Sequence, residues 1–326
     1  MWKFLSSINK NLVIAIPVMM VLGFIYGLNF QVDYLKNLIL PFTFFMVFPM
    51  MVTLKVKKVF EGGDTKAQLL TQVINFGIIP FIAFGLGRLF FADRPFMALG
   101  LLLAGLLPTS GMTISWTGFA KGNVEAAIKM TVIGLIIGSI ATPFYVKFLM
   151  AANLEVNIIA IMKQIAVIVL LPMVAGFLAQ QYLIKKLGQA TFQKKWAPRF
   201  PGMAIIGVLG IVFVAIALKA VAIANSPQML MAIIFPLLII YFLNYLLATV
   251  IGKTLLPEGD AIALVYGSVM RNLSIALAIS INAFGPEGSS AALVIAVAYI
   301  IQVQSAAWYV KLTGKLFLRK KVIATS

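Results

Sequence analysis

The stretch SVMRNLSIALAIS, Ser268–Ser280, places an arginine and an asparagine inside a run that is otherwise apolar for a full membrane crossing. The cost of that charge depends on the solvent around the segment, which the composition identifies. Of the 326 residues, 62% are hydrophobic and 11% charged, whereas soluble domains have roughly 45–50% and 25%. The mean hydropathy is +1.05. We therefore predict an all-α integral membrane protein, because a bilayer accommodates apolar surface that a soluble fold cannot bury.

The residue types that are missing exclude several classes of function. The chain has no cysteine and no histidine, so it has no thiolate, no disulfide, and neither the usual metal ligand nor the usual general base. No HExxH, GxSxG or Walker-type loop occurs either. We predict a protein that is not an enzyme and that uses no cofactor or catalytic metal.

Apolar runs of roughly 20 residues, the length that crosses a hydrocarbon core, divide the chain into ten predicted spans. These lie at 11–29, 34–54, 68–91, 96–120, 124–149, 156–182, 201–224, 228–251, 260–284 and 288–312.

The lysines and arginines responsible for the net charge of +17 are distributed unevenly among the connections between these spans. Most lie at the two ends of the chain and in the even-numbered connections. Near the odd-numbered connections there are only Lys36, Arg88, Arg94 and Lys147. By the positive-inside rule, both termini are cytoplasmic and the protein crosses the cell (inner) membrane several times. The first ten residues read as a cytoplasmic tail rather than a removable signal, and the basic charge predicts no nucleic-acid partner.

A short internal repeat predicts the architecture. Met20–Phe24 in the first span recurs as Met173–Phe177 in the sixth, and an offset of five spans inverts the second copy in the membrane. Helix breakers also correspond, with Leu107–Gly111 in the fourth span and Gly267–Asn272 in the ninth. We predict two inverted five-helix repeats, 1–150 and 151–326, with a binding site at the broken fourth and ninth spans.

Two motifs resemble a known superfamily. LLPTSGMTISWTGFAKGNVEAA, Leu106–Ala127, resembles the fourth-span motif of the bile acid:sodium symporters and arsenite permeases, and MRNLSIALA, Met270–Ala278, resembles the ninth-span motif. The resemblance is nearest to the bacterial bile acid:sodium symporter homologues. It implies a panel domain of spans 1, 2, 6 and 7, and a core domain of spans 3–5 and 8–10. It also implies that broken spans 4 and 9 cross in the core, and that transport occurs by alternating access.

The departures from this pattern concern the transported ions. Where the sodium-coupled symporters have a Ser-Asn pair, this chain has Thr113 and Ile114, and where they have a ninth-span glutamate it has Gly267. Their span-nine glutamine corresponds to Arg271, while Thr131 keeps a hydroxyl ligand. One sodium site is therefore expected to be absent.

Arsenite capture is excluded by a second departure. The cysteine that follows the fourth-span proline in the arsenite permeases corresponds to Thr109.

Arg271 admits three interpretations, because a charge at bilayer depth costs at least about 2.5–3.5 kcal/mol and so requires a reason. It can be a structural pin that donates to carbonyls freed by the broken helices. It can stand in for the missing sodium ion. It can also clamp an anionic substrate, since its planar fork matches a carboxylate or phosphate.

The predicted site collects polar residues at the two breaks and at similar depth. The predicted substrate contacts are Arg271, Asn272, Thr109, Ser110, Thr113, Ser274, Asn244 and Gln304. If a sodium site is retained, its predicted ligands are Gln72, Met270, Thr131 and Asn75. Lys129 either pairs with Glu125 one turn away or turns inward and joins Arg271.

These residues predict a secondary transporter for a small organic anion or oxyanion, sodium-independent because Arg271 replaces the ion. The first alternative is a sodium-coupled organic-anion symporter. The second, from another class, is a membrane scaffold that transports nothing. A channel is disfavoured, because polarity is confined to two breaks and forms no continuous stripe.

Overall fold

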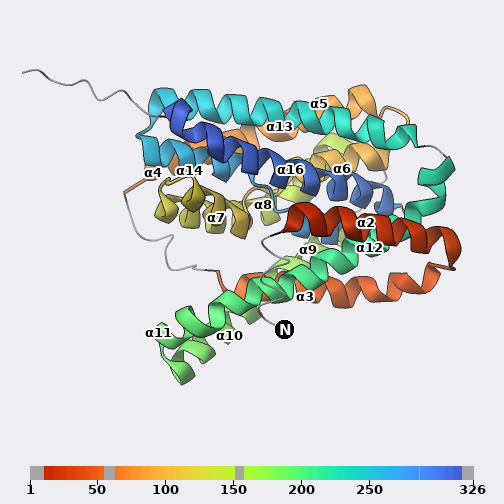
Figure 1. The fold of residues 1–326 in the computed structure, drawn as a ribbon, viewed down its shortest axis with the longest axis horizontal. Helices are drawn as coiled ribbons and strands as arrows, with labels where there is room; N and C mark the ends of the chain where they lie inside the picture. Colours follow the sequence, from red (N-terminus) through yellow and green to blue (C-terminus); the bar gives the residue numbers. More distant parts are fainter. Residues whose placement is uncertain (1–10, 55–62, 151–157, 226, 286, 318–326) are drawn as a thin grey trace, which may run out of the picture.

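A computed structural model describes residues 11–54, 63–150, 158–225, 227–285 and 287–317 (Figure 1). Apart from one isolated bridge, these residues form helices and their connections, as the all-α prediction requires. The elements are α2 (Leu12–Asn29), η1 (Asp33–Leu38), α3 (Ile39–Val52), α4 (Thr65–Gln72), η3 (Val73–Ile78), α5 (Ile79–Phe90), α6 (Pro95–Leu106), α7 (Gly111–Phe119), α8 (Val124–Met150), α9 (Ile158–Ile165), η4 (Ala166–Leu170), α10 (Leu171–Leu187), α11 (Gln189–Thr191), η5 (Phe192–Trp196), η6 (Ala197–Arg199), α12 (Phe200–Asn225), α13 (Gln228–Leu255), α14 (Glu258–Val269), α15 (Leu273–Phe284) and α16 (Gly288–Phe317).

Length and composition identify the segments that can cross a membrane. Five helical stretches among the described residues are long and apolar enough: Thr65–Phe90, Val124–Met150, Gln189–Val221, Gln228–Leu255 and Gly288–Phe317. Shorter apolar helices cover Ile14–Asn29, Pro41–Val52, Pro95–Leu106 and Leu273–Phe284. Several apolar helices of this kind indicate a multi-pass membrane protein.

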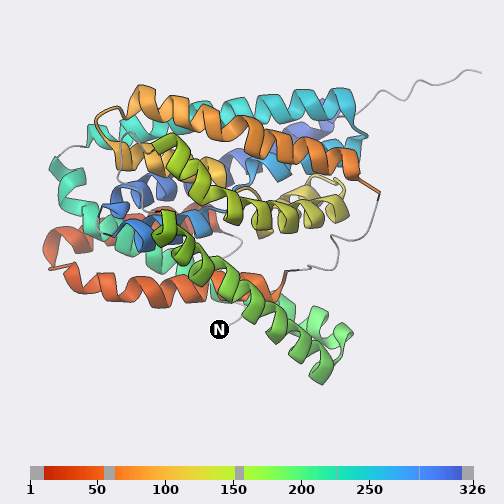
Figure 2. The same cartoon turned by 180° about the vertical axis from the view of Figure 1, so that it is seen from behind.

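The helices form two groups that lie side by side (Figures 1 and 2). In one group, α12 packs along α2 and α3, and α10 packs on α3. In the other, α13 packs on α14, α5 on α6, and α16 on α6 and α15. The end of α10 together with α11 extends beyond the remaining helices in both views.

Two segments leave helical geometry inside the second group. The helix that α6 begins stops at Leu106 and resumes as α7 at Gly111, because Pro108 lacks an N–H group and clashes with the preceding turn. Similarly, α14 ends at Val269 and α15 begins at Leu273. Both breaks fall where the sequence predicts them, and they position the site described next.

Candidate functional site

The two breaks, Leu107–Ser110 and Met270–Asn272, contact each other directly, and we call this contact region the crossing. Pro108 and Arg271 form an isolated antiparallel bridge, and the amide of Asn272 donates to the carbonyl of Leu107 at 2.7 Å. The hydroxyl of Thr113 donates to the carbonyl of Met270 at 3.4 Å. Backbone groups that lost their helical partners thus satisfy one another, as buried polar groups must in a membrane.

Each broken helix restarts with a side-chain cap. In α7 the Ser110 hydroxyl accepts from the amide of Met112 at 3.2 Å, and the Thr113 hydroxyl accepts from the amide of Ser110 at 3.1 Å. In α15 the Asn272 side chain accepts from the amide of Ile275 at 3.3 Å. Serine and asparagine favour this position because their oxygens reach the free amides of the first turn. The remaining amides leave the positive ends of both helix dipoles at the crossing.

Thr109 holds the turn between Pro108 and α7 in an unusual conformation. Its φ is +62°, which costs roughly 1–2 kcal/mol for a residue with a Cβ. Its hydroxyl donates to the carbonyl of Thr131 at 3.2 Å, which ties the turn to α8. Thr109 is fully buried, so it contributes to the packing of the crossing and is not exposed to the large cavity.

A cavity of about 300 Å³ lies beside the crossing, between α3 and α12 on one side and α7, α8, α15 and α16 on the other. It is lined by Met50, Met51, Thr53, Leu54, Ser110, Gly111, Met112, Ile114, Ser115, Ile128, Thr131, Val132, Leu135, Ala204, Ile205, Val208, Arg271, Asn272, Leu273, Ser274 and Tyr299. None of these described lining residues is acidic. The volume is in the range of small-molecule sites.

The predicted substrate residues divide between this cavity and the protein behind it. Ser110, Arg271, Asn272 and Ser274 line the cavity. The described lining of the cavity does not include the other four, which are Thr109, Thr113, Asn244 and Gln304. Thr131, predicted as an ion ligand, also lines it.

Tyr299 is a cavity residue that the sequence does not single out. Its hydroxyl and that of Ser274 form a short hydrogen bond across α15 and α16. One tyrosine in an apolar span carries no sequence signal that separates it from core packing, so the side chain is identified as a lining residue only through the fold.

The end of the Arg271 side chain is buried. Its Nη1 and Nη2 atoms are buried and have no hydrogen-bond partner among the described residues. Besides the large cavity, Arg271 borders a second one of only about 10 Å³, which Tyr241 of α13 and Asn244 also line. Because Nη1 and Nη2 are buried, they are not exposed in the large cavity.

Gln302 of α16, two positions before the predicted substrate contact Gln304, holds the backbone of Arg271. Its Oε1 accepts from the amide of Arg271 at 2.8 Å, and its Nε2 donates to the Arg271 carbonyl at 3.1 Å. Its Oε1 also accepts from the hydroxyl of Tyr241 at 2.9 Å. Residues two apart on a helix point about 200° away from each other, so only one of the two glutamines can face the break.

Two asparagines hold the last carbonyls of α14. Asn75 donates to the carbonyl of Gly267 at 3.0 Å, and Asn244 donates to the carbonyl of Ser268 at 2.9 Å. Asn75 lies in η3, a π-helical segment of the kind that often re-aims a side chain at a functional site. Both asparagines therefore stabilise the break through its backbone carbonyls, and neither lines the large cavity.

The predicted ion ligands retain unpaired acceptors. The Oδ1 atom of Asn75 and both amide atoms of Gln72 are buried without a partner among the described residues. The carbonyl of Met270 accepts a long bond from Thr113, and the Thr131 hydroxyl donates to the carbonyl of Ala127 at 2.7 Å.

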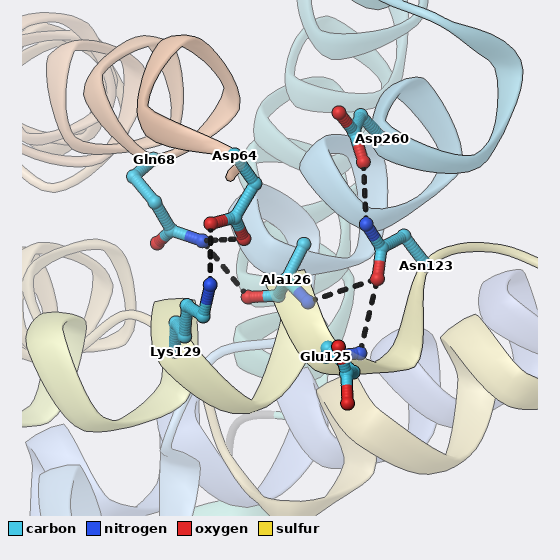
Figure 3. A network of polar contacts seen from close by, with 7 residues as sticks. All are labelled: Asp64, Gln68, Asn123, Glu125, Ala126, Lys129 and Asp260. Carbon is cyan, nitrogen blue, oxygen red and sulfur yellow. Dashed lines mark hydrogen bonds and ion pairs between the residues drawn. The ribbon is translucent and has the colours of Figure 1, made fainter. Parts of the chain in front are cut away.

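Lys129 does not join Arg271. Its ammonium contacts Asp64 Oδ1 at 2.8 Å, and both side chains are more than nine-tenths buried (Figure 3). Gln68 completes the group by donating to Asp64 Oδ2 at 2.8 Å and to the carbonyl of Ala126 at 3.0 Å. Asp64 lies at the beginning of α4, so it is a partner of Lys129 that periodicity within one helix does not identify.

The neighbouring contacts in Figure 3 tie the connection between α7 and α8 to α14. Asn123 donates through Nδ2 to Asp260 at 2.7 Å, and its Oδ1 accepts from the amides of Glu125 and Ala126 at 3.1 Å. The amide of Asn123 also donates to the carbonyl of Gly259 at 2.8 Å. These bonds join the end of α7, the second half of the first broken segment, to the beginning of α14, the first half of the other.

Within the described ranges, no group of three or more acidic residues is placed to hold a metal ion. A site built from helix N-termini, hydroxyls and apolar walls instead suits an organic molecule with a negative group.

Known proteins with similar sequences carry related names. The chain is 23% identical to the arsenical-resistance protein Acr3 of Alkaliphilus metalliredigens, over 83% of this chain and 79% of that protein. It is 27% identical to an uncharacterized sodium-dependent transporter, YocS, of Bacillus subtilis, over 84% and 82% of the two chains. It is 28% identical to a probable chloroplastic sodium/metabolite cotransporter, BASS1, of Arabidopsis thaliana, over 55% and 43%.

The profile of the Sodium Bile acid symporter family matches residues 40–226, which is more than half of the chain. This match and the relatives confirm the resemblance inferred from the two motifs, and they identify a transmembrane transporter rather than an enzyme. The protein belongs to the sodium bile acid symporter family.

Proposed function

We propose that this transporter moves a small organic anion or an oxyanion across the membrane and does not require sodium. The observation that carries the proposal is the large cavity, at which the N-termini of α7 and α15 converge and whose described lining has no acidic residue. Helix N-termini attract anions through free amides and the helix dipole. The Met, Ile, Val and Leu side chains of the walls suit an apolar body attached to the anionic group.

We further infer ten spans arranged as two inverted repeats, 1–150 and 151–326. Corresponding glycines support this arrangement, because a Cβ on Gly23 of α2 would lie 2.6 Å from the Phe213 carbonyl oxygen of α12. A Cβ on Gly176 of α10 would lie 2.6 Å from the Met51 Cβ of α3. The two repeats thus use the same glycine for the same kind of close helix contact.

In this arrangement α2, α3, α10 and α12 belong to the panel, and the other long helices belong to the core. The cavity lies where panel and core face each other. Movement of the core against the panel would open the cavity to one side of the membrane and then to the other, which is alternating access.

Arg271 supplies a fixed positive charge in place of a sodium ion. A structural pin would donate from its guanidinium to freed carbonyls, yet Nη1 and Nη2 have no partner among the described residues, and Gln302 holds the backbone instead. A direct clamp would expose these nitrogens in the large cavity, but they are buried. The ion-substitute interpretation is therefore the best supported of the three.

The space around Gly267 supports the absence of one sodium site. A Cβ at this position would lie 2.7 Å from the Sδ atom of Met130. A side chain at position 267 would therefore require the Met130 side chain to move.

A sodium-coupled organic-anion symporter is the second candidate. Gln72 and Asn75 favour it, because their buried oxygens have no donor among the described residues and oxygen atoms are the ligands that sodium prefers. Membership of a transporter family leaves the scaffold alternative without support.

Thermal unfolding of the purified protein tests the proposal. Wild type and Arg271→Gln are compared in NaCl and in choline chloride, each with a panel of monocarboxylates, dicarboxylates and oxyanions. We expect an anion to stabilise wild type equally in both salts, and we expect the variant to lose this response. Arg88→Gln is the matched control, because it removes one arginine from the end of α5 and should respond as wild type does. Strong stabilisation by sodium alone would instead establish the sodium-coupled candidate.

A further inference from the structure

The connection from α10 to α12 concentrates positive charge at the part of the molecule that extends beyond the other helices (Figures 1 and 2). We call its five cationic residues the basic patch: Lys185, Lys186, Lys194, Lys195 and Arg199. Residues 158–225, which contain the patch, include no Asp or Glu. Nothing within this segment therefore offers the patch a carboxylate.

The orientation of α10 is fixed by its contacts with α3. Gly176 and Gln180 face α3, where the Gln180 amide donates to the carbonyl of Val52 at 2.8 Å. Leu171, Val174 and Leu178 lie on another side of the helix and are 61%, 54% and 60% exposed. In a membrane-spanning helix an exposed apolar row of this kind faces lipid.

The lipid-facing row of α10 leads directly into the basic patch. Tyr182 continues it at i+4 from Leu178 and is 63% exposed, and Lys185 and Lys186 follow at i+3 and i+4 from Tyr182. The ammonium of Lys186 lies 5.9 Å from the centre of the Tyr182 ring. The order of these side chains matches the layers of a membrane surface. The apolar row corresponds to the acyl chains, tyrosine to the interface and lysine to the phosphate groups.

The second half of the connection repeats this combination. Lys194 and Lys195 are exposed, and the guanidinium carbon of Arg199 lies 5.0 Å from the centre of the Trp196 ring. Tryptophan and arginine both favour the headgroup layer. The two halves thus place cations and amphipathic rings together.

We propose that the basic patch binds the phosphate groups of anionic phospholipids in the adjacent leaflet, with Lys185 and Lys186 as the principal contacts. The acyl chains of the same lipids lie along Leu178 and Val174. This site is separate from the large cavity, and it does not depend on the identity of the transported solute.

The test is a lipid titration of the purified full-length chain in neutral detergent. The midpoint of thermal unfolding is followed while palmitoyl-oleoyl phosphatidylglycerol, the corresponding phosphatidylcholine, or glycerol phosphate is added. We expect stabilisation by phosphatidylglycerol only. Lys185→Gln/Lys186→Gln should raise the half-saturating lipid concentration about 25-fold, since each lysine near an anionic surface contributes about fivefold in affinity.

The matched control is Lys311→Gln/Lys315→Gln, which removes two exposed lysines from the end of α16 and should titrate as wild type does. The conservative Lys185→Arg/Lys186→Arg variant should also retain binding, because it keeps both charges. As a second readout, brominated phosphatidylglycerol should quench the part of the fluorescence that Trp196→Phe removes.

Three results would overturn the proposal. One is equal stabilisation by phosphatidylcholine, and another is a wild-type titration for Lys185→Gln/Lys186→Gln. The third is full stabilisation by glycerol phosphate at matched concentration, which would mean that free phosphate suffices and that no lipid surface is recognised.

Discussion

The amide nitrogen of Asn272 donates to the carbonyl oxygen of Leu107 at 2.7 Å, which joins two segments that lie far apart in the sequence. Each segment has left helical geometry at this point, so each supplies the backbone group that the other lacks. The same contact directs the N-termini of α7 and α15 at one cavity. The crossing is therefore both the structural solution for two broken helices and the reason why we propose an anionic substrate for the cavity.

Adding one methyl group at Gly134, next to Pro108 and Thr109, should destabilise the folded protein. In Gly134→Ala the new Cβ would lie 2.7 Å from the Thr109 hydroxyl and 3.4 Å from Pro108 Cγ. Because Thr109 is already held at a positive φ, we expect a loss of roughly 1–3 kcal/mol in the free energy of unfolding. Gly314→Ala has open space around it and should be neutral or slightly stabilising. Thermal unfolding of both variants measures the difference, and equal midpoints would contradict a tightly packed crossing.

Gln302→Leu should be far more damaging than Gln304→Leu. The first change removes the partner of both the amide and the carbonyl of Arg271, and each buried group left unsatisfied costs about 1–3 kcal/mol. We expect a clear fall in the unfolding midpoint for Gln302→Leu and little change for the other variant. Similar midpoints for the two would mean that Gln302 does not hold the break.

Breaking the buried ion pair between Lys129 and Asp64 should destabilise the protein strongly. Lys129→Met leaves a carboxylate buried without its cation, which typically costs about 3–5 kcal/mol. The double variant Lys129→Met/Asp64→Asn removes both charges and should recover part of the loss. A double-mutant cycle of unfolding free energies measures the coupling, and additive losses would show that the pair contributes no interaction of its own.

Restoring a carboxylate at position 267 should not restore a sodium response. The Sδ atom of Met130 occupies the space that the side chain of Gly267→Glu requires. We expect no stabilisation of this variant by NaCl relative to choline chloride. Gly267→Glu/Met130→Ala provides the missing space and is the informative comparison, because a sodium response confined to the double variant would identify Met130 as the obstacle.

Cysteine labelling tests the proposed orientation, and the absence of native cysteine makes the experiment direct. Lys186→Cys and Lys36→Cys place single thiols at connections that the charge distribution assigns to opposite sides of the membrane. In intact cells, a membrane-impermeant maleimide should label the position-36 thiol and should reach the position-186 thiol only after lysis. Labelling of both thiols in intact cells would contradict the assigned topology.

Much of the architecture could be predicted because membranes impose strong rules on sequence. Apolar runs reveal helices, since every backbone group in lipid must be paired within the segment. Pro108 and the Gly267–Asn272 stretch reveal the breaks for the same reason, because such residues are tolerated there only at a protein-lined site. Asn272 and Ser110, the two residues that cap the restarted helices, could also be identified from their positions beside the breaks.

The partners of individual side chains were harder to predict. Gln302 and Gln304 look equivalent in the sequence, and the difference between them is the direction in which α16 presents each residue. The contact of Lys129 with Asp64 could not be predicted either, because periodicity compares positions on one helix only. Tyr299 and Met130 have no distinguishing signal, although one lines the large cavity and the other fills the space beside Gly267.

The sequence alone determined that this chain is an all-α membrane protein with two broken helices and an arginine at one of the breaks, because backbone pairing and charge burial in lipid act on each segment locally. Only the tertiary structure decided that the two breaks bond to each other and that Nη1 and Nη2 of Arg271 are buried instead of exposed in the large cavity. The bond between the breaks joins residues more than a hundred positions apart, and both relationships depend on how the helices pack, which no local pattern records.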